Sequence, residues 1–207
     1  LLIAEKFILN KLKVANGDLT VFRDLNVPHN DQRRVPMPQQ VLSKSDFAFS
    51  VDSVLVNSDI HIHIVPKEAS GIGTMTLNID MRSHHFKSGK PMLLQAKGRL
   101  NEAAKFNTKV NFPIPSEKGE FQFLGNISPM ELRNLNEMLI PLGAIEVRSG
   151  YNEGVNINFK GNEDYAEGLM EFRYNNLKID ILDRETYQSK GFGNNLKTIF
   201  ANSFVVS

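Results

Sequence analysis

Apolar and polar residues alternate along most of the chain, which is the pattern of β-strands that bury one face. In the segment SDIHIHIVPK, which starts at Ser58, isoleucines occupy positions 60, 62 and 64, and histidines occupy positions 61 and 63. Side chains on a strand alternate between its two faces, so the isoleucines share one face and the histidines share the other. The segment therefore predicts a strand with one apolar and one polar side.

The same alternation predicts about ten strands, each bounded by Gly, Asn, Pro or Ser. The expected strands cover residues 7–14, 19–22, 47–56, 60–64, 73–81, 92–98, 106–112, 121–127, 145–147, 155–159, 166–174 and 177–181. Two tight hairpins are expected, at Asn16-Gly17 and at 57–59, because both stretches carry residues that favour turns. These hairpins have similar sequences, which indicates that one hairpin motif is repeated within one sheet. Between Val51 and Val54 the alternation slips by one residue, which predicts a β-bulge.

One helix is expected over residues 129–142. Ser128 and Glu131 have the spacing of a capping box around Pro129, which suits the first helical position. Leucines then recur at intervals of three or four residues until Gly143 ends the run. The sequence therefore predicts one helix, with clear start and stop signals, among many strands.

The remaining segments add little regular structure. Residues 26–45 read as a Pro-rich loop with a helical turn near Gln39–Leu42. A second short helix is expected over 194–201, where apolar residues recur on one side. The whole chain, residues 1–207, is expected to form a single β-rich domain that is a fragment of a longer protein.

The expected helix is too small to cover the expected sheet. Strands lie about 4.8 Å apart, so a sheet of about ten strands is roughly 45 Å across. A helix of about 13 residues is only ~20 Å long and ~10 Å wide. We therefore predict a mainly β fold, or α+β with one or two short helices, in which a large antiparallel sheet curls into a groove or taco or folds into a flattened sandwich.

The bulk composition excludes several classes of function. The chain has 207 residues, a formal net charge of +1 and no block of like charge, so a nucleic-acid partner is not expected. It has no cysteine, which removes disulfides, thiolate metal ligands and thiol nucleophiles. No apolar run reaches the roughly 18 residues of a membrane span. The start LLIAEK resembles no signal peptide, so we expect a mature product or an excised fragment.

His61 and His63 are candidate metal ligands, because they lie about 6–7 Å apart on one strand face. A zinc site needs a third and usually a fourth ligand, which His84 or His85 could supply only if that segment folds back. The alternative is that both histidines lie on a solvated strand face, and we favour it.

Other motifs also have plainer explanations. The glycines at 71 and 73 and at 191 and 193 lack the surroundings of a phosphate-binding loop, and no G-x-S-x-G nucleophile elbow is present. Glu167 and Glu171 alternate on a strand beside Arg173, which is typical of a solvated face rather than a glycosidase pair; Glu163 and Asp164 lie nearby. We therefore expect no catalytic residue, no cofactor and no metal, and we do not expect an enzyme.

Three passages resemble the C-terminal part of AsmA-like envelope proteins of Gram-negative bacteria. The first joins FRD at Phe22 to FAFSVDSVLVNSDI at Phe47. The second joins FPIP at Phe112 and GEFQFLG at Gly119 to the passage SPMELRNLNEMLIPLGAIEVRSG that ends at Gly150. The third joins MEFRYNNLKIDIL at Met170 to NLKTIFAN at Asn195. The resemblance spans nearly the whole chain, but residues 61–65, HIHIV, depart from the Tyr-x-Glu strand typical of the family.

The resemblance implies a non-enzymatic periplasmic protein anchored in the inner membrane by a helix outside this chain. It also implies a curled β-groove with an apolar interior and a role in outer-membrane biogenesis and phospholipid transport. The residues expected to line such a groove are Ile60, Ile62, Ile64, Phe121, Phe123, Ile157, Phe159, Met170, Phe172, Ile179 and Ile181.

An alternative stays open. The same apolar side chains fill the core of an ordinary β-sandwich in many proteins, and the chain would then be a structural or protein-interaction module that binds no lipid. In either case the strands at the two ends of the sheet are possible sites of oligomerisation, because they carry unpaired backbone groups.

Overall fold

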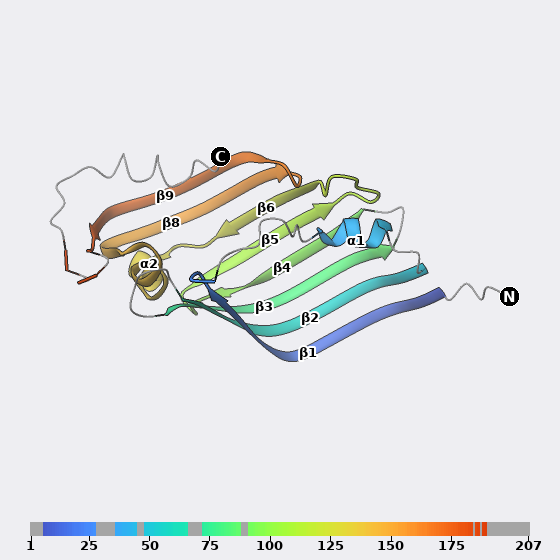
Figure 1. The fold of residues 1–207 in the computed structure, drawn as a ribbon, viewed down its shortest axis with the longest axis horizontal. Coiled ribbons are helices and arrows are strands. Elements are labelled where there is room, and N and C mark those ends of the chain that lie inside the picture. Colours follow the sequence, from blue (N-terminus) through green and yellow to red (C-terminus); the bar gives the residue numbers. More distant parts are fainter. Residues whose placement is uncertain are drawn as a thin grey trace.

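The computed structural model describes residues 6–27, 36–44, 48–65, 72–87, 91–183, 185–186 and 188–189 (Figure 1). Its elements in chain order are β1 (Lys6–Asp24), α1 (Pro38–Lys44), β2 (Ala48–Val65), β3 (Gly73–Lys87), β4 (Met92–Leu100), β5 (Ala104–Phe112), β6 (Phe121–Ile127), β7 (Met130–Glu131), the 3-10 helix η1 (Leu132–Leu135), α2 (Asn136–Gly143), β8 (Ile145–Gly161) and β9 (Ala166–Ile181).

The nine strands belong to one sheet, in the order β1-β2-β3-β4-β5-β6-β8, with β9 on the far side of β8. The short β7 pairs with β8 in line with β6. The prediction of a mainly β fold with one large sheet and two short helices is confirmed. The sheet is mixed, because β1 pairs with β2 in parallel while every other pair is antiparallel. The described strands form no second layer, so the sandwich form is not adopted.

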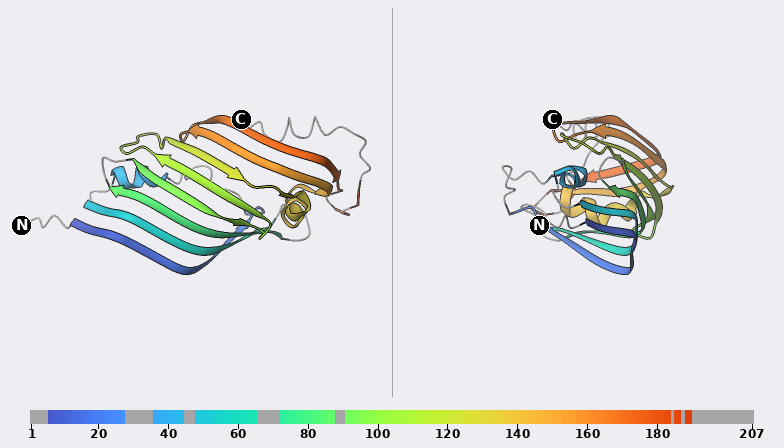
Figure 2. Two further views of the ribbon diagram at one scale, coloured as in Figure 1. Left: turned by 180° about the vertical axis from the view of Figure 1, so that it is seen from behind. Right: turned by 90° about the vertical axis from the view of Figure 1, so that its right-hand side faces the viewer.

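The sheet is curled, and both helices lie on its concave side (Figure 2, right). They lie at opposite ends of the strands: α1, in light blue, is near the start of β2, and α2, in gold, is near the start of β8 (Figure 1). The helices therefore cover two separate parts of the concave face.

The two hairpins predicted at Asn16-Gly17 and at 57–59 are wrong. Both sites lie inside continuous strands, β1 of 19 residues and β2 of 18 residues. Asn16 has φ 53° and sits at a break in register between Val14 and Gly17, so the Asn-Gly pair makes a β-bulge rather than a turn. The bulge predicted between Val51 and Val54 is absent, because the pairing of β2 with β3 is continuous there.

The similarity between the two mispredicted hairpins has a different origin. In the parallel pair, Gly17 lies opposite Ser58, with valines before them and Leu19 opposite Ile60 after them. A Cβ atom at Gly17 would come within 2.9 Å of the Ser58 Oγ, so the Ser58 side chain occupies the space beside the glycine. The repeated sequence thus marks one level of the sheet, at which β1 and β2 pair in parallel.

The helix predicted over residues 129–142 begins later than expected. Residues 130 and 131 form β7, the 3-10 turn η1 follows, and α2 starts only at Asn136. Ser128 does not cap a helix: its Oγ accepts a hydrogen bond from the Lys105 amide of β5. The helical turn predicted at Gln39–Leu42 is confirmed by α1, and the helix predicted over 194–201 lies outside the described residues.

Two small hydrophobic clusters form the core, one near each helix. The first combines Leu100, Ala104, Met130, Leu132 and Val147 at the α2 end of the strands. The second combines Met92, Phe112 and Ile114 at the other end. Between these clusters the concave face has no comparable buried centre among the described residues.

Candidate functional site

An apolar band crosses the concave face between the two clusters. It consists of two rows of cross-strand neighbours that run from β1 to β9. The first row is Val14, Val56, Met81, Ala96, Thr108, Gly125, Ile157 and Met170, and the second is Leu12, Val54, Ser83, Leu94, Val110, Phe123, Phe159 and Gly168.

The side of the sheet that carries the band is the side that α2 covers. Residues two apart on a strand share a face, so Gly73 and Met81 of β3 face the same way. A Cβ atom at Gly73 would lie 3.2 Å from Leu142 of α2. The apolar band is therefore continuous with the face beneath the helix.

The large side chains of the apolar band are only partly buried. Among its members only the small residues Ala96 and Ser83 are buried, whereas Met81, Phe123 and Ile157 keep intermediate exposure. At the β1 end, Leu12 and Val14 are each 43% exposed. An apolar surface of this extent, left open between two packed clusters, is typical of a ligand or partner site.

Phenyl rings lie over glycines along the floor of the band. A Cβ atom at Gly125 would come within 2.9 Å of the Phe123 ring. At Gly168 and Gly98 a Cβ atom would first meet a backbone carbonyl oxygen of the neighbouring strand, that of Asn158 at 2.0 Å and that of Asn78 at 1.6 Å, with the Phe159 and Phe106 rings at 2.3 Å and 3.0 Å. Because these glycines have no side chains, neighbouring rings and backbone can approach the sheet closely at these positions.

At the α1 end of the strands, two buried glutamines of the helix bind a neighbouring loop. Gln39 donates from Nε2 to the Glu120 carbonyl at 2.8 Å, and Gln40 donates to the Glu117 carbonyl at 3.1 Å. The Met37 amide in turn donates to Gln40 Oε1 at 2.9 Å. These bonds fasten α1 to the loop 113–120; within it the Ser116 hydroxyl donates to Glu120 and lowers the pKa of that carboxyl.

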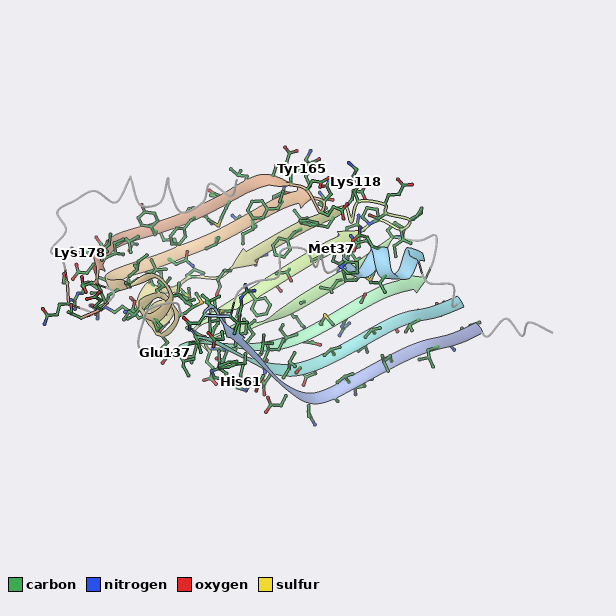
Figure 3. The ribbon with its side chains drawn as sticks, in the orientation of Figure 1. Met37, His61, Lys118, Glu137, Tyr165 and Lys178 are labelled. Atoms are coloured by element: carbon green, nitrogen blue, oxygen red, sulfur yellow. The ribbon has the colours of Figure 1, made fainter. Side chains whose placement is uncertain are left out.

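The α2 end is held by a polar network. Asn136 at the start of α2 bonds the Val147 backbone at both its amide, 2.8 Å, and its carbonyl, 3.0 Å. Arg148 pairs with Asp180 of β9 at 2.8 Å and with Glu146 at 3.1 Å. The Arg148 hydrogen bond lowers the pKa of the Asp180 carboxyl. Figure 3 shows the two closures at opposite ends of the strands, with Met37 beside α1 and Glu137 on α2.

The opposite face of the sheet is polar. Asn107, Asn126 and Asn156 are direct cross-strand neighbours there, and a shallow hollow of about 570 Å³ beside them is also lined by Arg82, Lys97 and Lys109. Lys97 pairs with Asp80 at 3.7 Å. The curled sheet thus separates an apolar from a polar side.

His61 and His63 lie on this polar face and are half-buried. His61 Nε2 is 3.7 Å from Asp18 Oδ1. Within the described part of the chain, no group of three or more His, Asp or Glu side chains gathers in a way that could hold a metal ion. His84 and His85 lie in β3, but their side chains are outside what the structure describes.

The carboxylates considered as a catalytic pair lie on the same solvated face. Glu167 pairs with Lys160 at 2.9 Å, which raises the pKa of the lysine. Glu171 accepts a hydrogen bond from Asn156 at 3.1 Å. Both carboxylates thus lie on an exposed surface with polar neighbours.

The structure places every residue predicted to line a groove on the concave face. The members of the apolar band are Phe123, Ile157, Phe159 and Met170; Phe121 and Phe172 lie beside it; Ile60, Ile62, Ile64, Ile179 and Ile181 lie toward α2. Sequence reasoning missed the contributions of β1, β3, β4 and β5 to the band, and from β2 it missed Val54 and Val56. Their alternation was visible, but only the strand register shows which of their faces is concave.

Within the described residues, no helix has the length and apolar character that a membrane span requires. The chain matches no family model, no curated protein and no solved structure. The resemblance to AsmA-like proteins therefore rests on the passages quoted above.

Proposed function

We propose that the apolar band holds the acyl chains of a phospholipid. The observation that carries the proposal is the partial exposure of the large apolar side chains along a band flanked by packed clusters. The protein would act without making or breaking a covalent bond: the concave face shields acyl chains, and the headgroup stays in water at the rim.

The dimensions of the apolar band suit an acyl chain. Eight strands lie side by side along it, so at about 4.8 Å per strand the band is roughly 34 Å long. The hydrocarbon core of a bilayer is about 30 Å thick, so one acyl chain spans about half of that. Each CH₂ group taken out of water contributes about 0.8 kcal/mol, so partial shielding along such a length is a substantial driving force.

The proposed setting is the periplasm of a Gram-negative bacterium. There the chain would be part of an AsmA-like protein that is anchored in the inner membrane and contributes to outer-membrane biogenesis by phospholipid transport. The support for this setting is the resemblance in sequence together with the open, curled sheet.

Native mass spectrometry and solvent extraction test the proposal. The protein is purified from a bacterial envelope without detergent, and bound phospholipid is counted per chain. The informative variant is Ile157→Asp, which puts a charge into the apolar band. Asn158→Asp is the control for the added charge, because it introduces the same carboxylate on the polar face one residue away.

We expect phospholipid at a defined stoichiometry with the unaltered chain and the Asn158→Asp control, and its loss with Ile157→Asp. Circular dichroism checks that both variants stay folded. Lipid-free protein, or equal lipid on both variants, contradicts the proposal and favours a structural or protein-interaction module.

A further inference from the structure

The sheet ends in two long edges that resemble one another in size and direction. β1 has 19 residues and β9 has 16. Among the described residues, no strand pairs with the outer side of either. Long unprotected edges are the usual sites at which β-sheets join other chains.

β1 and β9 run in the same direction. β1 is parallel to β2, and each later neighbour across the sheet reverses direction, so the strands alternate until β9 again matches β1. The β9 edge of one copy can therefore meet the β1 edge of another as a parallel pair. β1 already makes a parallel pair with β2 inside the chain.

Charges on the polar face complement one another when each row of the sheet continues straight into the next copy. The row that begins at Lys11 ends at Glu167. Asp18 and Arg173 lie at matching levels, because each follows a member of the Gly17–Phe172 row by one residue. Unlike charges opposite one another on paired strands are favourable.

The concave side of both edges is apolar. On β1, Leu19 is 51% exposed and Val21 42% exposed, in addition to the two members of the apolar band. On β9, Met170 and Phe172 are half-buried and Tyr174 is 45% exposed. Pairing of the edges would cover these side chains and continue the band from one copy into the next.

We propose that a second copy of this chain docks its β9 edge on the β1 edge, in parallel and in the unstaggered register that places Glu167 beside Lys11. The contact is head-to-tail, so each copy keeps one free edge and the assembly can grow. The inference does not depend on bound lipid, because the backbone pairing and the charges on the polar face can form without it.

A charge swap tests the pairing. Lys11→Glu and Glu167→Lys each place like charges at the contact, while a mixture of the two variants restores unlike charges at each contact between the two different variants. Glu167 also pairs with Lys160 within the chain. The mixture is therefore compared with each variant alone, because the loss of this internal pair is the same in both measurements. Analytical ultracentrifugation of lipid-free protein over a concentration series gives the association constant.

We expect the unaltered chain to self-associate, each variant alone to do so about fivefold or more weakly, and the mixture to recover most of the loss. A chain that is monomeric throughout the series overturns the proposal. So does a mixture that associates no better than its parts.

Cysteine trapping tests the register, because the chain has no cysteine of its own. Lys13 and Leu169 end the same row, so a Lys13→Cys, Leu169→Cys double variant is expected to oxidise into a ladder of linked chains. The control, Lys13→Cys with Asn126→Cys, puts the second thiol on a central strand and should give no ladder. Dimers from Lys13→Cys alone would instead indicate that β1 pairs with β1, which overturns the head-to-tail contact.

Discussion

Gly125 sets the depth of the apolar band at the level of a single residue. A Cβ atom there would lie 2.9 Å from the Phe123 ring and 3.6 Å from Thr108 Cγ2, so a larger residue must displace the ring. We predict that Gly125→Val costs about 1–3 kcal/mol through overpacking and reduces the lipid bound per chain. Urea unfolding and native mass spectrometry measure the two effects.

The control for Gly125 is its neighbour on the other face. Asn126→Val adds the same side chain at an exposed strand position and should change stability by no more than about 0.5 kcal/mol. Equal destabilisation by both variants would mean that the strand, rather than the floor of the band, resists the added side chain.

Asp180 gives a residue-scale prediction with a definite dependence on pH. The Arg148 hydrogen bond lowers the carboxyl pKa below its ordinary value of 3.8. A lowered pKa stabilises the fold above the ordinary value, and this stabilisation is lost as pH falls through the lowered pKa. We therefore expect Asp180→Asn to lower the urea midpoint at neutral pH and to match the unaltered chain in strong acid.

Asp164→Asn controls for the loss of one carboxylate, since Asp164 pairs with Lys118 at the longer distance of 3.7 Å. Its urea midpoint should fall less than that of Asp180→Asn at neutral pH. If the difference in urea midpoint between Asp180→Asn and the unaltered chain widened in acid, the pH dependence would be opposite to the one expected, and the prediction would be wrong.

At the scale of elements, polar bonds from two buried glutamines hold α1 to the loop 113–120. Val41 on this helix is 53% exposed, while Gln40 is only 4% exposed and bonded to Met37 and Glu117. Gln40→Ala removes the bonding partner of the partly buried Met37 amide and Glu117 carbonyl, which costs about 1–3 kcal/mol. Hydrogen exchange should then rise in the loop 113–120 before it rises in the sheet.

Gln95→Ala is the control for the α1 prediction, because Gln95 is exposed on the polar face of β4. It should leave both stability and exchange in the loop unchanged. If the Gln40 and Gln95 variants behave alike, the glutamine bonds do not hold α1 in place.

Elements were predictable from the sequence where a single period governs them. Alternation identified the strands and placed Ile60, Ile62 and Ile64 on one face, because the two-residue period of a strand needs no knowledge of its partners. Turn chemistry was less informative. Asn16-Gly17 accepts positive φ in a bulge as well as in a hairpin, so the residues alone did not distinguish the two.

The late start of α2 has a similar explanation. The capping-box spacing of Ser128 and Glu131 is a local signal, but Ser128 bonds to β5, 23 residues away along the chain. A contact between distant strands thus outweighed a local preference for helix. The prediction of the apolar band was incomplete for the same reason. Which face of β3, β4 and β5 is concave depends on their pairing partners, and a local sequence pattern does not show these.

For the whole molecule, the open sheet follows from a shortage of covering elements. The predicted mismatch between a wide sheet and one small helix is present, with α2 only 8 residues long and α1 only 7. The parallel partner of β1 was not predictable, because a strand pattern carries no information on direction. The two edges and the apolar band between them are properties of the assembled sheet.

The parallel pairing of β1 also bears on the order in which the molecule forms. Most strands pair with the strand just before them, and such local contacts form rapidly. β1 can pair only after the crossover through α1 has brought β2 alongside in the same direction, and parallel pairs need such long connections. β1 therefore stays without this partner until β2, which lies after the crossover in the chain, has been placed beside it.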